Sequence, residues 1–593
     1  MTAAPAEKTT LPARLLELAA SRPRDVGVRW KQFGKWQEFT WAAYASRVAG
    51  IAAGLRDLGV GPGTRVAIHA ENRPEWIFTD LAVQGLGGVS VGIYPTSPAA
   101  EVEYVLADAS VEVLVTEDEE QLDKVLAVRD RLLALQHIIV IDPRGVRSPD
   151  VLTFADVADR EDVLDAYAAS VAELDPSATA ILVYTSGTTG PPKGAMISHA
   201  NLVAAGQSFV TSLPAGPSDE LLSYLPLCHV AERLLSVMDA LWAGATVNFG
   251  EGGESFPHDL RDVQPTVFLG VPRVWEKMMA GVEIRMADAS WLKRVTYRAC
   301  VSAGRRISVR RMRGSLSLVD RAVLGVCWLL VFRSLREKLG MARVRVPLSG
   351  AAPIAPQVLE WLWAIGIQVR EGYGQTENTA ICTLNPATDV RLGTVGVASP
   401  SVEVRIAADG EILTRSAGVF QGYLNITSSP VDDEGWLHTG DIGTLDDDGY
   451  LRITDRKKDI IITAGGKNIS PSEIENLLKV SPYIREAIVI GDRRKYVTAL
   501  IGIELETVGD WATRRDLPYT TYADLSGKPE VFALIRNVVH AANRQLAQVE
   551  HVKRFCLLDK ELDHEDGELT ATQKVKRTAI ARRFATQIEE MYR

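Results

Sequence analysis

The sequence contains few cysteines, and none of them belongs to a paired motif. Five are spread over 593 residues without a C-x-x-C pair: Cys228, Cys300, Cys327, Cys382 and Cys556. A scattered, odd-numbered set argues against a zinc site and a disulfide framework, and it favours a reduced cytoplasmic location. The first residues carry scattered charges and no apolar segment, so we expect no secretory signal.

The chain also lacks an excess of positive charge. Lys and Arg number 65 against 75 Asp and Glu, which gives a net charge of −10. This balance argues against a general nucleic-acid-binding protein. At this length, and with 46% hydrophobic residues, the chain is expected to form at least two domains.

The uncharged run at residues 322–332, AVLGVCWLLVF, is too short to cross a bilayer as a helix. It lies within residues 291–338, which hold twelve basic and two acidic residues and so carry a local charge of +10. Two interpretations stay open. The segment is either a basic element that contacts the inner face of a membrane peripherally or a buried helix beside a solvated basic neighbour.

Short β-branched runs alternate with helical patterns through the first two thirds of the chain, which predicts an α/β fold. Later, Asp-Gly pairs between β-prone runs predict hairpins at residues 402–416 and 443–456. The expected strands lie at residues 64–70, 89–96, 111–116, 137–142, 179–183, 265–272 and 344–352.

A domain boundary is expected in the charged sequence DRKKD, residues 455–459. Beyond it, Ser470 at the N-cap, Pro471 at N1 and Glu473 at N3 form a capping-box pattern that predicts the start of a helix. We therefore expect an N-terminal domain at residues 1–456 and a C-terminal domain at residues 457–593.

The run YTSGTTGPPKG, residues 184–194, combines glycines, hydroxyl side chains and one lysine directly after a predicted strand. Backbone N–H groups, hydroxyls and the Lys193 charge suit an anion with several oxygens, phosphate first. It is not a Walker loop, because Pro191 and Pro192 precede the lysine and Gly194 replaces the Ser or Thr that would hold magnesium. By itself such a cluster is also compatible with a plain turn.

Four further runs complete a pattern. They are EGYGQTE (371–377), GWLHTGD (435–441), DRKKD (455–459) and GELTATQKVKR (567–577). The first of them follows the strand-like run IQV, residues 367–369. In this order, across most of the chain, they resemble the adenylate-forming superfamily of acyl-CoA synthetases, adenylation domains and luciferases. Within the superfamily, four runs look like the long-chain fatty acyl-CoA synthetase branch: LPLCHVAER (225–233), VPRVWEK (271–277), TAGGKNISPSEIE (463–475) and LTATQKVKR (569–577).

The resemblance implies a large N-terminal domain of β-sheets flanked by helices, a β-barrel-like subdomain, and a small mobile α+β C-terminal domain hinged at Lys458. It implies a ligase that joins a long-chain fatty acid to coenzyme A with ATP and Mg²⁺. The fatty carboxylate would attack the α-phosphorus to give acyl-AMP and pyrophosphate. The CoA thiol would then attack the acyl carbon and release AMP.

The resemblance also assigns the nucleotide site. Glu377 and Thr185 would hold magnesium, Tyr373 would stack on adenine opposite Gly350 and Ala351, and Thr376 would contact the α-phosphate beside Gly374. Asp441 would bind the ribose hydroxyls with Arg456 close by. The residues that would bind the β- and γ-phosphates are Thr185, Ser186, Gly187, Thr188, Thr189, Gly190 and Lys193.

By the same resemblance, Lys574 would bridge the carboxylate and the α-phosphate during adenylation. The C-terminal domain would then rotate, withdraw Lys574 and bring Gly465, Gly466 and Lys467 to a pantetheine tunnel. His229 would act as a gate beside the acyl pocket, although a packed core histidine is an open alternative. Arg273 and Trp275 would lie near the acyl side. The implied catalytic set is Lys574, Thr376, Glu377, Lys193 and His229.

Two residues depart from the family pattern near Lys574. Ala571 stands where Pro is usual, and Gln573 stands where the commoner form has Gly, so the rigidity of this loop is in doubt. Two alternatives also stay open: an acyl-AMP ligase that passes its product to a carrier protein, and a non-catalytic membrane-binding protein. The second would require loss of Lys193, Glu377, Asp441 or Lys574, all of which are present.

Overall fold

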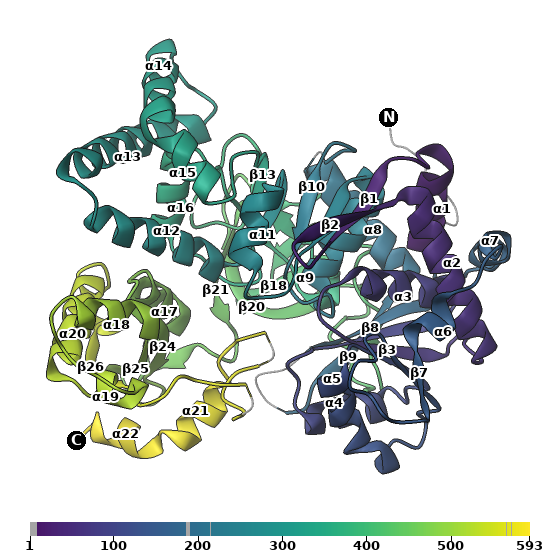
Figure 1. Cartoon of the computed structure of the whole chain (residues 1–593). Helices are drawn as coiled ribbons and strands as arrows, with labels where there is room; N and C mark the ends of the chain where they lie inside the picture. Colours follow the sequence, from purple (N-terminus) through teal and green to yellow (C-terminus); the bar gives the residue numbers. More distant parts are fainter. Residues whose placement is uncertain (1–8, 186–189, 214, 565, 571) are drawn as a thin grey trace.

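The computed structural model describes residues 9–185, 190–213, 215–564, 566–570 and 572–593 (Figure 1). A large N-terminal part contains the longest sheets, and a smaller C-terminal part, coloured yellow-green to yellow, lies below its helical arm. The predicted fold class is confirmed: α/β sheets flanked by helices, an antiparallel barrel-like subdomain and a small C-terminal α+β domain.

The longest sheet alternates its side chains between two cores. Val66 and Ile68 of β3 face helices α1 to α3, whereas Ala67 faces α4 and α5, as the two-residue period of a strand requires. The sheet contains, in order, β19 (Gly422–Tyr423), β9 (Lys193–Ser198), β8 (Thr179–Thr185), β4 (Val89–Ile93), β3 (Arg65–His69), β5 (Val113–Thr116), β6 (His137–Val140) and β7 (Val151–Thr153). The helices in this part are α1 (Leu11–Ser21), α2 (Trp41–Asp57), α3 (Pro74–Gly85), α4 (Ala99–Asp108), α5 (Glu119–Leu126), α6 (Phe154–Ala158), α7 (Leu164–Ala172) and α8 (His199–Ser212).

Two mixed sheets accompany the longest sheet in the N-terminal part. One contains β10 (Glu220–Ser223), β11 (Thr246–Phe249), β1 (Val26–Gln32) and β2 (Lys35–Thr40). The other contains β12 (Val267–Gly270), β13 (Val346–Ser349), β14 (Arg370–Tyr373), β15 (Thr383–Leu384) and β16 (Val397–Ala398). Between the strands lie α9 (Val230–Arg233), a π-helical segment η2 (Leu234–Asp239), α10 (Ala240–Ala243) and α11 (Phe256–Val263).

The strand expected at Ile367–Val369 was placed too early. The Ile367 N–H donates to the Leu362 carbonyl and the Val369 N–H donates to the Ile367 carbonyl. These groups form the turn after a helix, so pairing with β13 starts only at Arg370. The strand consequently runs into the EGYGQTE motif itself.

The two predicted hairpins are confirmed in an antiparallel sheet. Gly410 and Gly449 occupy the turns with φ values of 86° and 82°, a left-handed conformation that favours glycine. The sheet contains β17 (Glu403–Ile406), β18 (Glu411–Arg415), β20 (Leu437–Leu445) and β21 (Leu451–Arg456).

The C-terminal part has its own core around Ile474, Ile501 and Ile535. The Ser470 hydroxyl accepts from the Glu473 N–H at 3.4 Å, so Ser470 is the N-cap as predicted. The Asp455 carboxylate reaches the same helix start and accepts from the Ser472 N–H at 3.1 Å. The elements are β22 (Ile461–Ile462), β23 (Asn468–Ile469), α17 (Pro471–Lys479), β24 (Ile484–Ile490), β25 (Val497–Ile503), α18 (Leu505–Thr513), α19 (Tyr522–Ser526), α20 (Pro529–Asn543), β26 (Val552–Leu557), α21 (Arg577–Arg583) and α22 (Ala585–Glu590).

A helical arm projects from the N-terminal part at the upper left of Figure 1. It comprises α12 (Pro272–Ala287), α13 (Trp291–Met312), α14 (Leu318–Cys327), a π-helical segment η3 (Trp328–Phe332), α15 (Arg333–Lys338) and α16 (Pro356–Ala364). Its inner side chains pack around the buried Trp361. Within the described ranges, no helix combines the length and the apolar content that a membrane crossing would need.

Candidate active site

The predicted phosphate-binding loop connects β8 and β9. These strands pair antiparallel with Thr185 opposite Lys193, and the Thr185 hydroxyl donates to the Lys193 carbonyl at 3.5 Å. Gly190 adopts a φ of 95°. Ser186, Gly187, Thr188 and Thr189 lie outside the described residues. The ends of the loop therefore place a hydroxyl and a cation side by side.

Tyr423 connects this loop to the predicted magnesium ligand. The Lys193 ammonium lies 5.1 Å from the centre of the Tyr423 ring, and the Tyr423 hydroxyl donates to Glu377 Oε1 at 2.5 Å. Burial and the Glu377 charge raise the pKa of Tyr423, so its hydroxyl stays a donor. Sequence reasoning missed Tyr423, because it reaches the site through β19 pairing with β9 and carries no local motif.

Asp441 is the centre of a second group of polar side chains. Its Oδ2 accepts from the Tyr373 hydroxyl and from Gln375 Nε2, both at 2.6 Å. Arg456 lies opposite Asp441 in the β20–β21 pairing, with 3.4 Å between its Nε and Oδ1. Gln375 was also missed, although it stands inside the EGYGQTE motif. The buried carboxylate is thus oriented by two hydrogen-bond donors at the end of β14 and by one cation on β21.

The backbone around these groups contains one strained residue, Ala351, and two closely packed glycines, Gly350 and Gly374. Ala351, just after β13, adopts a φ of 66°, a strained conformation for a residue with a side chain. A Cβ on Gly350 would lie 3.3 Å from the Gly372 carbonyl oxygen, and a Cβ on Gly374 would lie 2.2 Å from the Ala380 carbonyl oxygen. Only glycine fits at Gly374, which leads the chain into the short 3₁₀ turn η4 (Thr376–Asn378).

Lys574 reaches this site from the C-terminal part. Its N–H donates to the Thr570 hydroxyl at 3.0 Å and its carbonyl accepts from the Thr570 N–H at 2.7 Å. Although part of the side chain stays open to solvent, crowding by protein atoms and the Arg456 charge lower the pKa of Lys574. The Asp441 and Glu377 charges raise the pKa of Lys574, so the ammonium group is within electrostatic range of both carboxylates.

The residue before this lysine, Gln573, is one of the two departures from the family pattern. Gln573 has a φ of 60°, in the left-handed region where glycine is the residue without a steric penalty. The loop therefore keeps the backbone conformation that suits glycine although glutamine is present. Ala571 lies outside the described residues.

His229 starts a helix and is within electrostatic range of Lys574. Its Nδ1 accepts from the Ala231 N–H at 3.1 Å, which makes it the N-cap of α9. Burial and the Lys574 charge lower the pKa of His229 to about 4, so the imidazole is neutral at pH 7. The structure thus gives His229 a structural role as an N-cap, and its role as a gate stays a prediction.

Several ion pairs join the C-terminal part to the N-terminal part. His564 Nε2 lies 3.1 Å from Glu101 Oε2 on α4, and Arg514 Nη1 lies 2.9 Å from Asp288 Oδ1. Arg273 pairs with Glu504 and so faces the C-terminal part. Trp275 is fully buried and donates to the Leu348 carbonyl at 3.2 Å. The three ion pairs thus link the part of the chain that carries Lys574 to the N-terminal part.

The residues expected to serve the second half-reaction lie elsewhere. Gly465, Gly466 and Lys467 form an exposed turn between β22 and β23, where the Gly466 N–H donates to the Thr463 carbonyl. Lys458 is exposed between β21 and β22. The structure leaves these predicted tunnel residues outside the group formed around Glu377 and Asp441.

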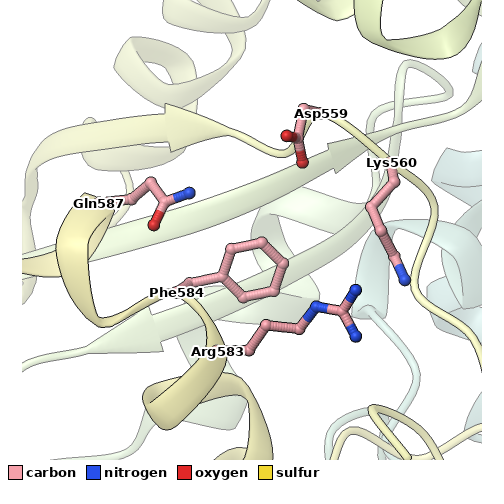
Figure 2. A pocket seen from close by; sticks show the side chains of 5 residues that line it. All are labelled: Asp559, Lys560, Arg583, Phe584 and Gln587. Atoms are coloured by element: carbon pink, nitrogen blue, oxygen red, sulfur yellow. The ribbon is translucent and has the colours of Figure 1, made fainter. Parts of the chain in front are cut away.

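A hollow in the C-terminal part is not this site (Figure 2). It encloses about 270 Å³ and is lined by Asp559, Lys560, Arg583, Phe584 and Gln587. Its two cations already pair with two carboxylates, Glu568, which lies 3.0 Å from each of them, and Asp566. Because their charge is neutralised, the hollow offers no free positive charge to a phosphate.

Comparison with known proteins identifies the family. The AMP-binding enzyme family matches residues 16–424, and the C-terminal domain of AMP-binding enzymes matches residues 458–593. The chain is a member of the AMP-binding enzyme family. This AMP-binding enzyme is 36% identical to the long-chain-fatty-acid--CoA ligase FadD15 of Mycobacterium bovis, over 94% of this chain and 93% of that one.

Other relatives of this AMP-binding enzyme agree. The long-chain-fatty-acid--CoA ligase ACSBG2 of Xenopus laevis is 32% identical over 96% of this chain and 81% of that protein. The crystal structure of the anthranilate CoA ligase AuaEII in complex with anthranoyl-AMP superposes with a TM-score of 0.73, at 20% identity and 98% coverage of both chains. The two proteins therefore share a fold.

Proposed function

We propose that this AMP-binding enzyme is a long-chain fatty acid:CoA ligase that acts through an acyl-AMP intermediate. The observation that supports this best concerns Lys574. It belongs to the C-terminal part, yet it is within electrostatic range of Asp441, Glu377 and Arg456 of the N-terminal part. A single mobile cation next to a nucleotide-binding carboxylate suits the joining of two anions. The names of the relatives support the fatty acid and CoA as substrates.

In the proposed first step, an oxygen of the fatty carboxylate attacks the α-phosphorus of ATP, and the bond to pyrophosphate breaks. Asp441 would accept from the ribose hydroxyls in place of the Tyr373 hydroxyl, freeing the Tyr373 ring to stack on adenine beside Gly350, Ala351 and Gly374. Lys193 and the hydroxyls of the loop, Thr185 among them, would neutralise the outer phosphates. Lys574, with Thr376, would stabilise the charge on the α-phosphate.

A magnesium ion fits the donors present. Glu377 and Thr185 supply the hard oxygen ligands that Mg²⁺ prefers, and the metal would take its remaining ligands from phosphate and water. Within the described residues no cluster of three or more His, Cys, Asp and Glu side chains could hold a metal. When bound, magnesium would neutralise charge on the phosphates.

For the second step we propose a rotation about Lys458, between domains at residues 1–456 and 457–593. The rotation would break the Glu101–His564 pair and withdraw Lys574 from the site. Gly465, Gly466 and Lys467 would then line the path of CoA, with neutral His229 at the acyl pocket. Four residues separate β21 from β22, which leaves no room for an inserted segment that would block the rotation.

Pyrophosphate exchange into ATP tests the first step. We expect exchange that depends on added fatty acid and increases with chain length, and stoichiometric consumption of CoA when it is added. Accumulation of acyl-AMP without CoA consumption would assign the alternative, a fatty acyl-AMP ligase that serves a carrier protein. Absence of exchange with every acid tested would refute adenylation.

Adenylation is also expected to depend on the protonation of His564. The Glu101 carboxylate raises the pKa of His564, against an opposing charge on Lys576. We call the arrangement in which Glu101 pairs with His564 the closed arrangement. Because the pKa of His564 is raised, the pair stabilises this arrangement fully at pH values below the ordinary histidine pKa. The stabilisation is lost as the pH rises through the raised value. Exchange by the wild type should therefore exceed that of Glu101→Gln by up to about fivefold at low pH.

The ratio of the two exchange rates should approach one at high pH. Glu103→Gln is the matched control, because Glu103 lies on the same helix but pairs with Arg131 at 3.0 Å. A ratio that stays constant across the pH range would show that the pair does not govern closure.

A further inference from the structure

The outer side of α14 and η3 is apolar and exposed. Leu318 is 82% exposed and Leu329 is 74% exposed. Val319, Val323, Val326 and Leu330 follow one another at spacings of four, three and four residues, so they form one stripe along the helix. We call these six residues the outer apolar surface. It lies on the arm that projects from the N-terminal part (Figure 1).

The opposite side of the same helix already packs against the protein. Cys327 and Phe332 are buried in the arm's core, and Leu324, Trp328 and Val331 pack against that core. An ordinary surface helix has one apolar stripe facing the core and a polar outer face. Here both faces are apolar, and the fold covers only one of them. The 322–332 run therefore has one side buried in the arm and one side exposed.

Exposed apolar side chains are concentrated in this arm. Among the described residues, seventeen large hydrophobic side chains are exposed, and ten of them lie between Trp291 and Leu330. Exposed apolar residues scattered singly need no explanation, whereas a contiguous group marks an interaction site. The members outside the outer apolar surface are Trp291, Leu292, Val295 and Val309.

The charge around this surface is strongly positive. Residues 291–338 carry +10, and since the whole chain carries −10, the remainder carries −20. Asp320, one of the two acidic residues of the segment, is neutralised by Arg310, whose Nε lies 3.0 Å from its Oδ2. The exposed basic residues include Arg305, Arg306, Arg313, Arg321 and Arg333.

We propose that the outer apolar surface docks onto an anionic lipid bilayer, with the surrounding arginines on the lipid headgroups. Apolar side chains that enter the headgroup boundary, together with basic residues beside them, are the two components of peripheral membrane binding. A two-fold contact with a second copy would place +10 against +10, which disfavours it. This inference rests on exposure and charge alone and is independent of the proposed function.

Co-sedimentation of the full-length chain with vesicles tests the proposal. The wild type should sediment with vesicles that contain phosphatidylglycerol, and much less with pure phosphatidylcholine, and binding should weaken as salt is raised. The double variant Val319→Glu/Leu330→Glu should lose this binding by about tenfold or more. Both positions are exposed, so the thermal melting temperature should not change.

The matched control is Phe33→Glu/Leu133→Glu, which alters two side chains of similar exposure, 82% and 94%, outside the arm. This variant should bind the anionic vesicles like the wild type. Equal binding by both double variants, or equal binding to the two lipid compositions, would overturn the proposal. So would a vesicle-free dimer that Val319→Glu/Leu330→Glu converts to a monomer, since the surface would then belong to a second copy.

Discussion

Replacement of Lys574 by Ala should abolish most of the adenylation activity and leave thioester formation largely intact. We expect acid-dependent pyrophosphate exchange to fall by about 10²- to 10³-fold, the usual cost of removing one preorganised group that stabilises transition-state charge. When acyl-AMP is supplied, conversion of CoA to the thioester should change less than about threefold. The two half-reactions are measured separately on the same preparation.

The physical reason lies in the surroundings of Lys574. Crowding by protein atoms and Arg456 lower its pKa, whereas Asp441 and Glu377 raise it. An incoming carboxylate and α-phosphate would add negative charge around Lys574. This charge would favour the ammonium form of Lys574, which would then lie close to the attacking and leaving oxygens. In the second half-reaction the lysine would be withdrawn, so its loss should matter little there.

Lys576→Ala is the matched control, because it removes a second lysine charge two residues away, at the start of α21. This variant should retain most of the exchange activity. Equal loss of both half-reactions in Lys574→Ala, at an unchanged melting temperature, would contradict a role confined to adenylation.

Local patterns predicted the elements on which this site is built. Hydrophobic runs with turn signals located β8, the two hairpins and the Ser470 cap, because these depend on residues close in sequence. The strand before EGYGQTE was misplaced, since the Ile367 and Val369 N–H groups serve a turn that hydrophobicity does not reveal.

Contacts between distant segments could not be predicted in the same way. Tyr423 meets Glu377 and Lys193 only because β19 joins the long sheet at its edge. The Glu101–His564 pair joins two parts of the chain that have separate cores. The residues next to Tyr423 and His564 in the sequence do not indicate these distant partners, so the contacts can be identified only in the folded chain.

Replacement of Asp441 by Asn should weaken nucleotide binding by about 100-fold, or about 3 kcal/mol. The carboxylate is buried and accepts from Tyr373 and Gln375 while Arg456 lies nearby. An amide of the same shape carries no charge and presents an NH₂ group to at least one of these donors, which leaves buried polar groups unpaired. Calorimetric titration with AMP measures the loss directly.

Tyr373→Phe is the control that removes the hydroxyl and keeps the aromatic ring, and it should change AMP binding by less than about 1 kcal/mol, because the ribose replaces that hydroxyl on Asp441. Asp441→Asn should have a second effect that Tyr373→Phe lacks. Because the Asp441 charge raises the pKa of Lys574, its removal should let Lys574 lose its proton at a lower pH. The high-pH limb of the exchange activity should then shift toward neutrality, measured at saturating ATP. If nucleotide binding weakens while that limb stays in place, Asp441 and Lys574 are not electrostatically linked during adenylation.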